Sequence, residues 1–162
     1  MRRLWAPWRH AYVSRAAQTR GCIFCTHPKS KRDAAHFIFL RSKNSFAMLN
    51  LFPYTNGHML IAPYRHVRLL SQLTDPELVD LWRLVDRSRE SLDHVIRPHA
   101  YNLGINLGRI AGAGVLGHVH VHLVPRWQGD TNFMTSVADV KVIPQSLRDL
   151  HRKLAGSKKG MG

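Results

Sequence analysis

The segment GHVHVHLVPRW, residues 117–127, constrains the fold most, because every second position in it carries an imidazole: His118, His120 and His122. Side chains of a β-strand alternate between its two faces, so the three rings would share one face and the branched residues between them the other. A helix would scatter the rings around its axis. The pattern therefore predicts a strand over 118–124, ended by Pro125, with one histidine face and one core face.

The histidine face indicates a functional site, because burying three adjacent polar rings without partners is costly. Imidazole is the commonest metal ligand, and it also titrates near neutral pH. The segment alone therefore leaves two functions open, a metal site and a catalytic site, and disfavours three unrelated structural histidines.

Length and composition indicate one ordinary domain, since the chain has 162 residues, of which 44% are hydrophobic. We expect a single domain over 1–155, with an N-terminal extension over 1–35, and a basic disordered tail over 156–162. No apolar run approaches the ~18 residues of a membrane span, and MRRLWAPWRH lacks the apolar stretch of a signal peptide. The chain is therefore expected to be cytoplasmic and to engage no membrane.

The charge balance predicts attraction to polyanions, because 24 Lys and Arg against 10 Asp and Glu give a formal net charge of +14. Nucleotides, RNA and anionic surfaces all satisfy this condition. Part of the charge lies in the ends of the chain, over 1–15 and 152–162, where basic residues are usually solvated. We therefore favour a nucleotide partner and do not expect nucleic-acid binding.

The rest of the chain predicts an α+β fold with two main helices. Strand patterns occupy 36–40, 45–50, 57–63 and 101–108, and a second helix pattern occupies 144–155. Thr74 and Glu77 match a capping box, and Pro98 closes the long helix that follows. Its apolar positions near the 3.6-residue repeat are Leu78, Leu81, Trp82, Val85, Leu92 and Val95. Short loops between sequential strands favour an antiparallel β-meander packed with the helices.

A second constellation is the cysteine pair, Cys22 and Cys25, which are the only cysteines and are spaced Cys-x-x-Cys. In a cytosolic chain this spacing favours a zinc half-site or a reduced pair over a structural disulfide. A tetrahedral structural site needs two further ligands, which histidines would have to supply. His66 and His118 are the candidates, and a plain reduced pair stays an alternative.

These motifs carry a family resemblance. HVHVHLV fits the His-x-His-x-His-x-x signature, with apolar x, of the histidine triad (HIT) superfamily of nucleotide hydrolases and transferases. MLNLFPYTNGHMLIAPYRHV resembles the family's Gly-His strand, and NLGRIAGAGVLGHVHVHLVPRW resembles its Gly-rich loop and triad. WAPWRHAYV, GCIFC and GDTNFM resemble the bacterial diadenosine tetraphosphate phosphorylase-like (ATP adenylyltransferase) branch. The likeness covers residues 4–150 and implies a HIT-like fold.

The resemblance implies a role for each histidine. His120 corresponds to the family's nucleophile, which attacks the α-phosphorus of a nucleoside phosphate to give a nucleotidyl-histidine. His122 and His58 correspond to the histidines that hold the phosphate oxygens, and we expect them to be wholly or partly protonated. His118 corresponds to the position whose backbone carbonyl orients the middle ring. A neutral imidazole whose other N–H donates to a fixed carbonyl is a suitable nucleophile.

Further residues correspond to the family's substrate-binding positions. Asn50 matches the residue that faces the ribose hydroxyls, and Asn106 matches an Asn on the phosphate side. The backbone N–H groups of the Gly-rich loop, with Gly112 and Gly114, could bind phosphates. Gly114 stands where the phosphorylase-like members have Ser, so any leaving-group role of that hydroxyl would pass to a backbone amide, Arg109 or water. Two alternatives stay open: both asparagines could have structural roles, and the loop could be a flexible connection that binds no ligand.

The resemblance also bears on the cysteine pair. Family members with a Cys-x-x-Cys bind zinc through both cysteines, the first triad histidine and one further histidine. The resemblance therefore implies structural zinc (Zn2+) at Cys22, Cys25, His66 and His118, and no organic cofactor.

Two classes of function follow. The preferred one is a nucleotidyl transferase or hydrolase that takes AMP from a dinucleoside polyphosphate, with inorganic phosphate or water as the acceptor; nucleoside phosphoramidates or aminoacyl-adenylates are a second substrate class. The rival is a non-enzymatic zinc-containing module that binds nucleotide or nucleic acid. Similarity to the family implies a homodimer. Trp5 and Trp8 could cover a second interface, as in tetrameric relatives, or fold onto their own core.

Overall fold

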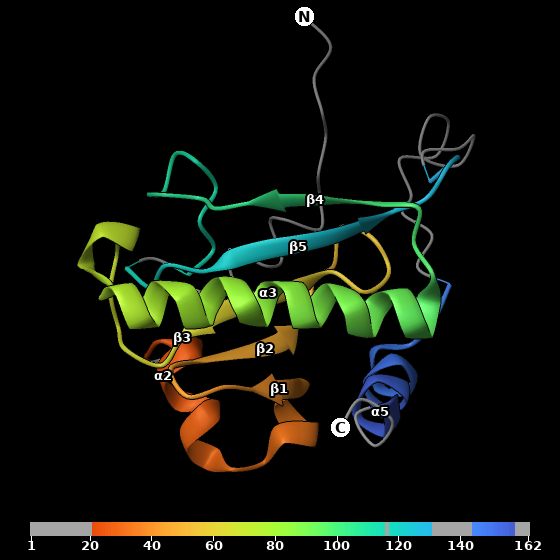
Figure 1. Ribbon diagram of the computed structural model, residues 1–162, viewed down its shortest axis with the longest axis horizontal. Helices are drawn as coiled ribbons and strands as arrows, with labels where there is room; N and C mark the ends of the chain where they lie inside the picture. The colour runs from red at the N-terminus through yellow and green to blue at the C-terminus, as the bar shows by residue number, and fades with distance from the viewer. Residues whose placement is uncertain (1–20, 116, 131–143, 158–162) are drawn as a thin grey trace, which may run out of the picture.

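The computed structural model describes residues 21–115, 117–130 and 144–157 (Figure 1). Within these residues one antiparallel sheet has five strands, in the order β1 (Ile38–Arg41), β2 (Ser45–Leu49), β3 (Met59–Pro63), β5 (Val121–Arg126) and β4 (Ala100–Gly104). The helices are α2 (Ile23–Thr26), α3 (Asp75–Ile96) and α5 (Leu147–Ser157), with 3-10 turns η1 (Pro28–Ser30), η2 (Asp33–His36) and η3 (Leu70–Gln72). The α+β class and the antiparallel sheet are confirmed.

The strand order departs from a simple meander at one place, because β5 lies between β3 and β4. α3 carries the chain along the sheet to the far edge, where β4 forms (Figure 1). The loop over 105–117 then brings the chain back to fill the position beside β3. β5, which contains His122 and directly follows His118 and His120, is therefore flanked by strands on both sides.

α3 begins and ends as the sequence predicts. Thr74 is its N-cap, and the Glu77 carboxylate accepts a hydrogen bond from the Thr74 backbone N–H at 2.8 Å. The left-handed Arg97, at φ 46°, ends the helix just before Pro98. Trp82, expected on the apolar stripe, is 42% exposed, because it lies about 100° around the helix axis from the buried Leu81.

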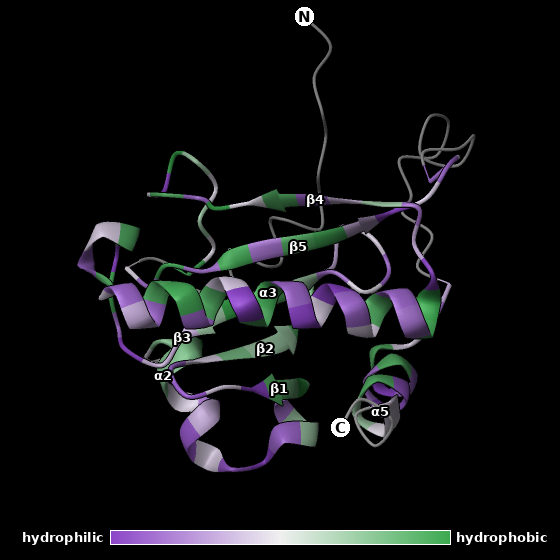
Figure 2. Ribbon diagram, viewed as in Figure 1, coloured by the Kyte–Doolittle hydropathy of each residue, from purple (hydrophilic) through white to green (hydrophobic). Residues whose placement is uncertain are grey.

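Apolar clusters cover both faces of the sheet. α3 and α5 pack on one face, against a cluster that includes the branched residues of the histidine segment: Val119, Val121 and Leu123. Figure 2 shows the resulting alternation of hydrophobic and hydrophilic stripes along α3. On the other face, Phe24 of α2 packs with Ile38, Phe46, Met48, Leu60 and Ala62. The predicted core face of the histidine segment is therefore observed.

β5 starts and ends later than the strand predicted over 118–124. The Val119 N–H donates outside the ladder, to a backbone carbonyl that precedes α3. Pro125 lies inside the strand, contrary to the prediction that it ends it. The pairing of β3 with β5 ends at Leu123. The nitrogen of Pro125 points to the same side of β5, where no strand pairs with it. On that side the Thr55 hydroxyl donates to the Pro125 carbonyl at 2.8 Å.

α5 packs beside β1. The Nε2 of its His151 lies 2.9 Å from the Ile38 carbonyl, and the ring meets Phe37 edge-on at 6.0 Å between centroids. Because a carbonyl only accepts, this Nε2 carries the proton. α5 extends to Ser157, so the first two residues of the expected disordered tail over 156–162 are helical, and its remainder lies outside the described residues.

Some predictions concern residues that the structure does not describe. These are the start of the N-terminal extension, with Trp5 and Trp8, and most of the GDTNFM motif. The domain boundaries also stay predictions. Within the described part of the chain, none of the helices is both long and apolar enough to span a membrane.

Candidate functional site

The structure gathers the triad histidines and His58 on the face of the sheet that α2 covers. His58, His118 and His120 are 0%, 2% and 3% exposed, whereas His122 is partly exposed. The ring centroids of His120 and His122 lie 4.9 Å apart, and those of His58 and His122 lie 5.2 Å apart. The histidines predicted from the sequence therefore form one cluster, which reaches the surface at His122.

A backbone carbonyl fixes the tautomer of His120. Its Nδ1 lies 2.9 Å from the carbonyl oxygen of His118. Because a carbonyl only accepts, Nδ1 carries the proton and Nε2 of the neutral ring carries the lone pair. The middle histidine therefore presents an unprotonated nitrogen, as a nucleophile requires.

A second chain of hydrogen bonds fixes the tautomers of His58 and His122. The Tyr54 backbone N–H donates to Nδ1 of His58 at 3.1 Å, so His58 must carry its proton on Nε2 when neutral. That Nε2 lies 2.9 Å from Nδ1 of His122 and donates to it. The proton of the neutral His122 ring then lies on Nε2, so His122 offers an N–H donor from a ring that lies 4.9 Å from that of His120 between centroids.

Burial decides the charge of these rings. Desolvation, reinforced by the charge of His120, lowers the pKa of His122 to about 4. Desolvation also lowers the pKa of His120, although the hydrogen bond to the His118 carbonyl partly opposes it. Both rings are therefore neutral at pH 7 in the free protein. The expectation that His122 is wholly or partly protonated is corrected accordingly.

The two predicted asparagines lie at the edges of the cluster. The Asn50 side-chain oxygen accepts from the Phe52 N–H at 3.0 Å, and its nitrogen lies 3.3 Å from Nδ1 of His58. Asn50 thus holds the loop before β3, which favours the structural role left open above, and its ribose contact stays a prediction. The amide nitrogen of Asn106 lies 3.5 Å from Nε2 of His122, next to the predicted phosphate position.

The Gly-rich loop lies beside the histidine face. Its Val115 packs against the apolar cluster around Phe24. Gly112 adopts φ 89°, and its N–H donates to the Arg109 carbonyl at 3.0 Å. This amide would therefore have to leave its partner to bind a phosphate. Phosphate binding by the loop, including Gly114, stays a prediction.

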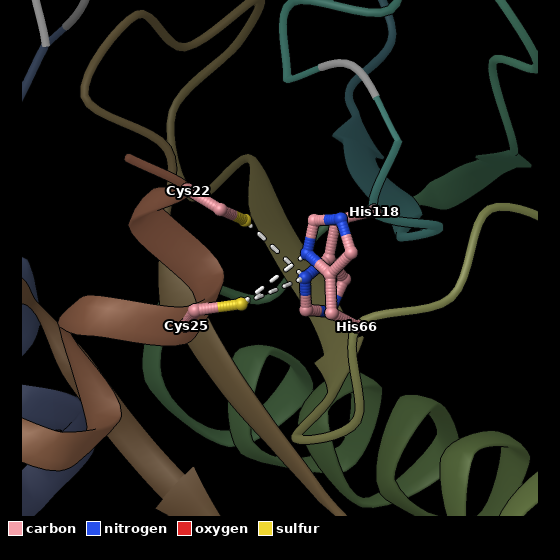
Figure 3. Close-up of side chains that lie close together, drawn as sticks. All are labelled: Cys22, Cys25, His66 and His118. Carbon is pink, nitrogen blue, oxygen red and sulfur yellow. Dashed lines mark hydrogen bonds between the residues drawn. The ribbon is translucent and has the colours of Figure 1, made fainter. Parts of the chain in front are cut away.

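The cysteine pair and two histidines form a second cluster, in which all four side chains point toward one another (Figure 3). The Cys22 sulfur lies 3.3 Å from Nδ1 of His118, and the Cys25 sulfur lies 3.3 Å from Nδ1 of His66 and 3.6 Å from Nδ1 of His118. Tetrahedral zinc, with bonds of about 2.3 Å to sulfur and 2.0 Å to nitrogen, places neighbouring ligand atoms about 3.3–3.8 Å apart. Three contacts among the four residues predicted from the sequence therefore have the spacing of zinc ligands, and all four ligand atoms lie within 4.8 Å of one another.

The protonation state of His118 is also suited to metal binding. Nε2 of His118 lies 2.9 Å from the Pro63 carbonyl and must donate to it, which leaves the lone pair of Nδ1 facing the sulfurs. Metal-binding histidines usually donate their other N–H in this way. Burial lowers the pKa of His118 to about 4, which keeps the ring in its metal-binding neutral form. Burial raises the pKa of the Cys22 thiol, an effect that a bound cation would oppose.

Two aromatic residues of the site, Phe24 and Tyr54, were not predicted from the sequence. The Phe24 ring lies 5.2 Å from that of His118 and 4.8 Å from that of His120, between centroids. The Tyr54 ring lies 4.6 Å from that of His58 and 6.1 Å from that of His122. Neither position has a local sequence signal, because both contacts depend on how distant segments meet.

Comparison with known proteins agrees with this geometry. The chain matches the HIT domain family over residues 31–129. It is 40% identical to a Mycobacterium tuberculosis protein named AP-4-A phosphorylase, over 96% of this chain and 83% of that protein. It is 41% identical to a Schizosaccharomyces pombe protein named bis(5'-nucleosyl)-tetraphosphatase (asymmetrical), over 62% of this chain and 55% of that protein. The fold is similar to that of a zinc-bound histidine triad family protein from Mycobacterium smegmatis, with a TM-score of 0.69, 22% identity, and coverage of 87% of this chain and 95% of that chain.

The charge state of His122 is testable by NMR of ring nitrogens. Because burial lowers its pKa to about 4, we expect the ring to stay neutral from pH 8 down to pH 5. The measurement is a pH series of long-range proton–nitrogen spectra on nitrogen-15-labelled protein, with the signals assigned by a His122→Gln variant. A midpoint near the ordinary histidine pKa of about 6.5 would contradict the expectation.

Proposed function

The chain belongs to the HIT domain family, and on that premise we propose that it cleaves dinucleoside polyphosphates at an α-phosphate through a covalent intermediate on His120. The relatives named above carry the names of a phosphorylase and a tetraphosphatase. The chain is thus an enzyme of the nucleotidyl transferase or hydrolase class, and the non-enzymatic module is set aside. The observation that carries the mechanism is the Nδ1–H bond to the His118 carbonyl, which leaves Nε2 unprotonated.

The reaction proceeds in two displacements at the same phosphorus. In the first, the lone pair of His120 Nε2 forms a bond to the α-phosphorus, and the bond to the bridging oxygen of the leaving nucleotide breaks with its electron pair on that oxygen. In the second, an oxygen of phosphate or water attacks the phosphorus, and the N–P bond breaks with its electron pair on Nε2. Phosphate as the acceptor yields ADP, and water yields AMP.

The surrounding groups support both displacements. The ring of His120 becomes positively charged when it is substituted, and the His118 carbonyl that accepts its Nδ1–H stabilises this charge. The ring of His122 lies 4.9 Å from that of His120 between centroids, and its Nε2–H donates to a phosphate oxygen. The amide nitrogen of Asn106 lies 3.5 Å from Nε2 of His122, and since both nitrogens are donors, both can donate to the same phosphate. The net charge of +14 attracts a polyanionic substrate.

Inorganic phosphate is the acceptor that we propose, because the relative that aligns with nearly the whole chain is named a phosphorylase. Hydrolysis is the second candidate, since the tetraphosphatase name belongs to a relative of similar identity over a shorter length. Phosphoramidates and aminoacyl-adenylates stay alternatives in the same class, because the same nitrogen would displace a different leaving group.

Product analysis with a nucleophile variant tests the catalytic proposal. With diadenosine tetraphosphate and inorganic phosphate, we expect ADP and ATP from the wild-type protein. His120→Asn removes the attacking nitrogen and should lower turnover more than about 1,000-fold. Anion-exchange chromatography measures the products, and His94→Asn on the exposed side of α3 is the matched control.

The outcomes separate the candidates. AMP and ATP in phosphate-free buffer would establish hydrolysis. Turnover that survives in His120→Asn would contradict the covalent mechanism. Absence of turnover in the wild-type protein with every acceptor would contradict the dinucleotide substrate and lead to phosphoramidates.

Structural zinc is the second part of the proposal. Cys22, Cys25, His66 and His118 would hold it, because their ligand atoms all lie within 4.8 Å of one another. When bound, the ion cross-links α2, the segment after β3 and the segment before β5. Thiolate ligands of this kind persist in a reducing compartment, which supports the proposed cytoplasmic location.

Metal analysis tests the zinc proposal. We expect about one zinc per chain by elemental analysis, and strong sulfur-to-metal charge-transfer bands after replacement by cobalt. Cys25→Ser removes one ligand and should abolish these bands and lower the thermal midpoint, whereas His94→Gln, on the exposed side of α3, should leave both unchanged. Purified protein that binds no metal and keeps two titratable thiols would contradict the proposal.

A homodimer is the third part, and the edge of the sheet supports it. Of the two edge strands of the sheet, β1 is mostly buried, whereas the residues of β4 are mostly exposed, with Leu103 at 53%. An edge strand presents unpaired backbone groups to a second strand. Pairing of β4 with its copy across a two-fold axis would join the two sheets.

Sedimentation velocity tests the dimer. We expect dimeric wild-type protein, and a monomer for Leu103→Glu, because the two-fold axis brings like charges together. Leu69→Glu changes an equally apolar exposed residue, 46% exposed, far along the chain from β4, and is the control. A monomeric wild-type protein, or a Leu103→Glu variant that stays dimeric, would contradict β4 pairing. A tetramer would show that a further surface is used.

A further inference from the structure

Phe24 links the two clusters of the site. It lies between Cys22 and Cys25 in α2 and is 0% exposed. Its ring contacts the rings of His118 and His120, at 5.2 and 4.8 Å between centroids. One aromatic side chain therefore connects the candidate metal ligands with the candidate nucleophile.

The His120 ring needs such a contact. Its hydrogen bond to the His118 carbonyl fixes one nitrogen, but a single bond at one edge leaves the ring free to tilt about that point. The rings of Phe24 and His122, at 4.8 and 4.9 Å, pack against it and restrict this tilt. The direction of the Nε2 lone pair therefore depends on where Phe24 lies.

The position of Phe24 depends in turn on the cysteine segment. α2 has four residues, and a single helical turn is unstable by itself. Its other anchors are the apolar cluster, where Phe24 lies 6.2 Å from Phe46 between ring centroids, and the sulfur atoms that face His66 and His118. A metal ion at those sulfurs would fasten α2 on both sides of Phe24.

We propose that Phe24 is a positioning residue that holds the His120 ring in its attacking orientation, and that the metal-bound cysteine segment keeps Phe24 in place. This proposal rests on the proposed function of His120. It gives the metal site an effect on the reaction, although none of the four metal-binding residues supplies the attacking atom. The effect passes through the Phe24 ring and through His118, whose ring faces the cysteines while its carbonyl orients His120.

Phe24→Leu tests the positioning role, with Phe39→Leu as the matched control. The two side chains are 0% and 1% exposed, but Phe39 belongs to the apolar cluster on the opposite face of the sheet from the histidines. We expect both variants to lose similar thermal stability. Only Phe24→Leu should lower kcat, by about tenfold, with little change in KM, because the orientation of the nucleophile changes and the substrate contacts do not.

Nitrogen-15 NMR of the His120 ring gives a readout besides activity. We expect the wild-type and Phe39→Leu spectra to show a single tautomer, protonated at Nδ1. Phe24→Leu and the metal-free Cys25→Ser protein should both show averaged or broadened signals. Combining the two substitutions should add little further change in kcat or in the spectrum, because they act on the same contact.

The outcomes distinguish this proposal from the function on which it rests. Phe24→Leu that matches Phe39→Leu in kcat and in the ring spectrum would overturn the positioning role. A Cys25→Ser spectrum identical to that of the metal-bound wild-type protein would overturn the link to the metal. Wild-type protein without turnover would contradict the proposed function, and the NMR comparison would still decide whether Phe24 orients the ring.

Discussion

The hydrogen bond between the His120 ring and the backbone carbonyl of His118, 2.9 Å long, is the constraint on which the rest of the site depends. It forces one tautomer on a ring that could otherwise carry its proton on either nitrogen. A carbonyl carries no net charge, so it directs the lone pair while raising the pKa of the ring less than a carboxylate would, and burial still leaves that pKa lowered. His120 keeps this tautomer only while the backbone of His118, two residues before the proposed nucleophile, stays in place.

Three contacts keep that backbone in place. The ring of His118 donates to the Pro63 carbonyl at 2.9 Å, and its other nitrogen faces the cysteine sulfurs. Val119 is 2% exposed on the opposite face, where the core under α3 holds it. These contacts lie just before the β5 ladder begins at Val121, where strand pairing does not yet hold the chain. The cluster of cysteines and histidines and the apolar core thus both stabilise the segment that orients His120, the proposed nucleophile.

The sequence predicted the features that depend on local periodicity. The alternation around His120 indicated which side chains share a face, and the capping box at Thr74 located the start of α3. Features set by distant partners were not predictable. Pro125 lies within β5 because β3 ends short of it, and Trp82 is exposed because the sheet selects a different face of α3. The contact of Phe24 with the histidines was not predictable, because it depends on the packing of α2 against the face of the sheet that carries them.

The alternation of apolar and imidazole side chains from His118 to Leu123 also limits how such a chain can change in length. One residue inserted or deleted there would turn every following side chain to the opposite face, with rings in the apolar core and branched residues at the substrate. Extra residues in the loop over 105–117 leave this order intact, because that loop precedes the segment. Single-residue insertions and deletions from His118 to Leu123 therefore exchange the two faces, whereas those before His118 leave the order of the faces unchanged.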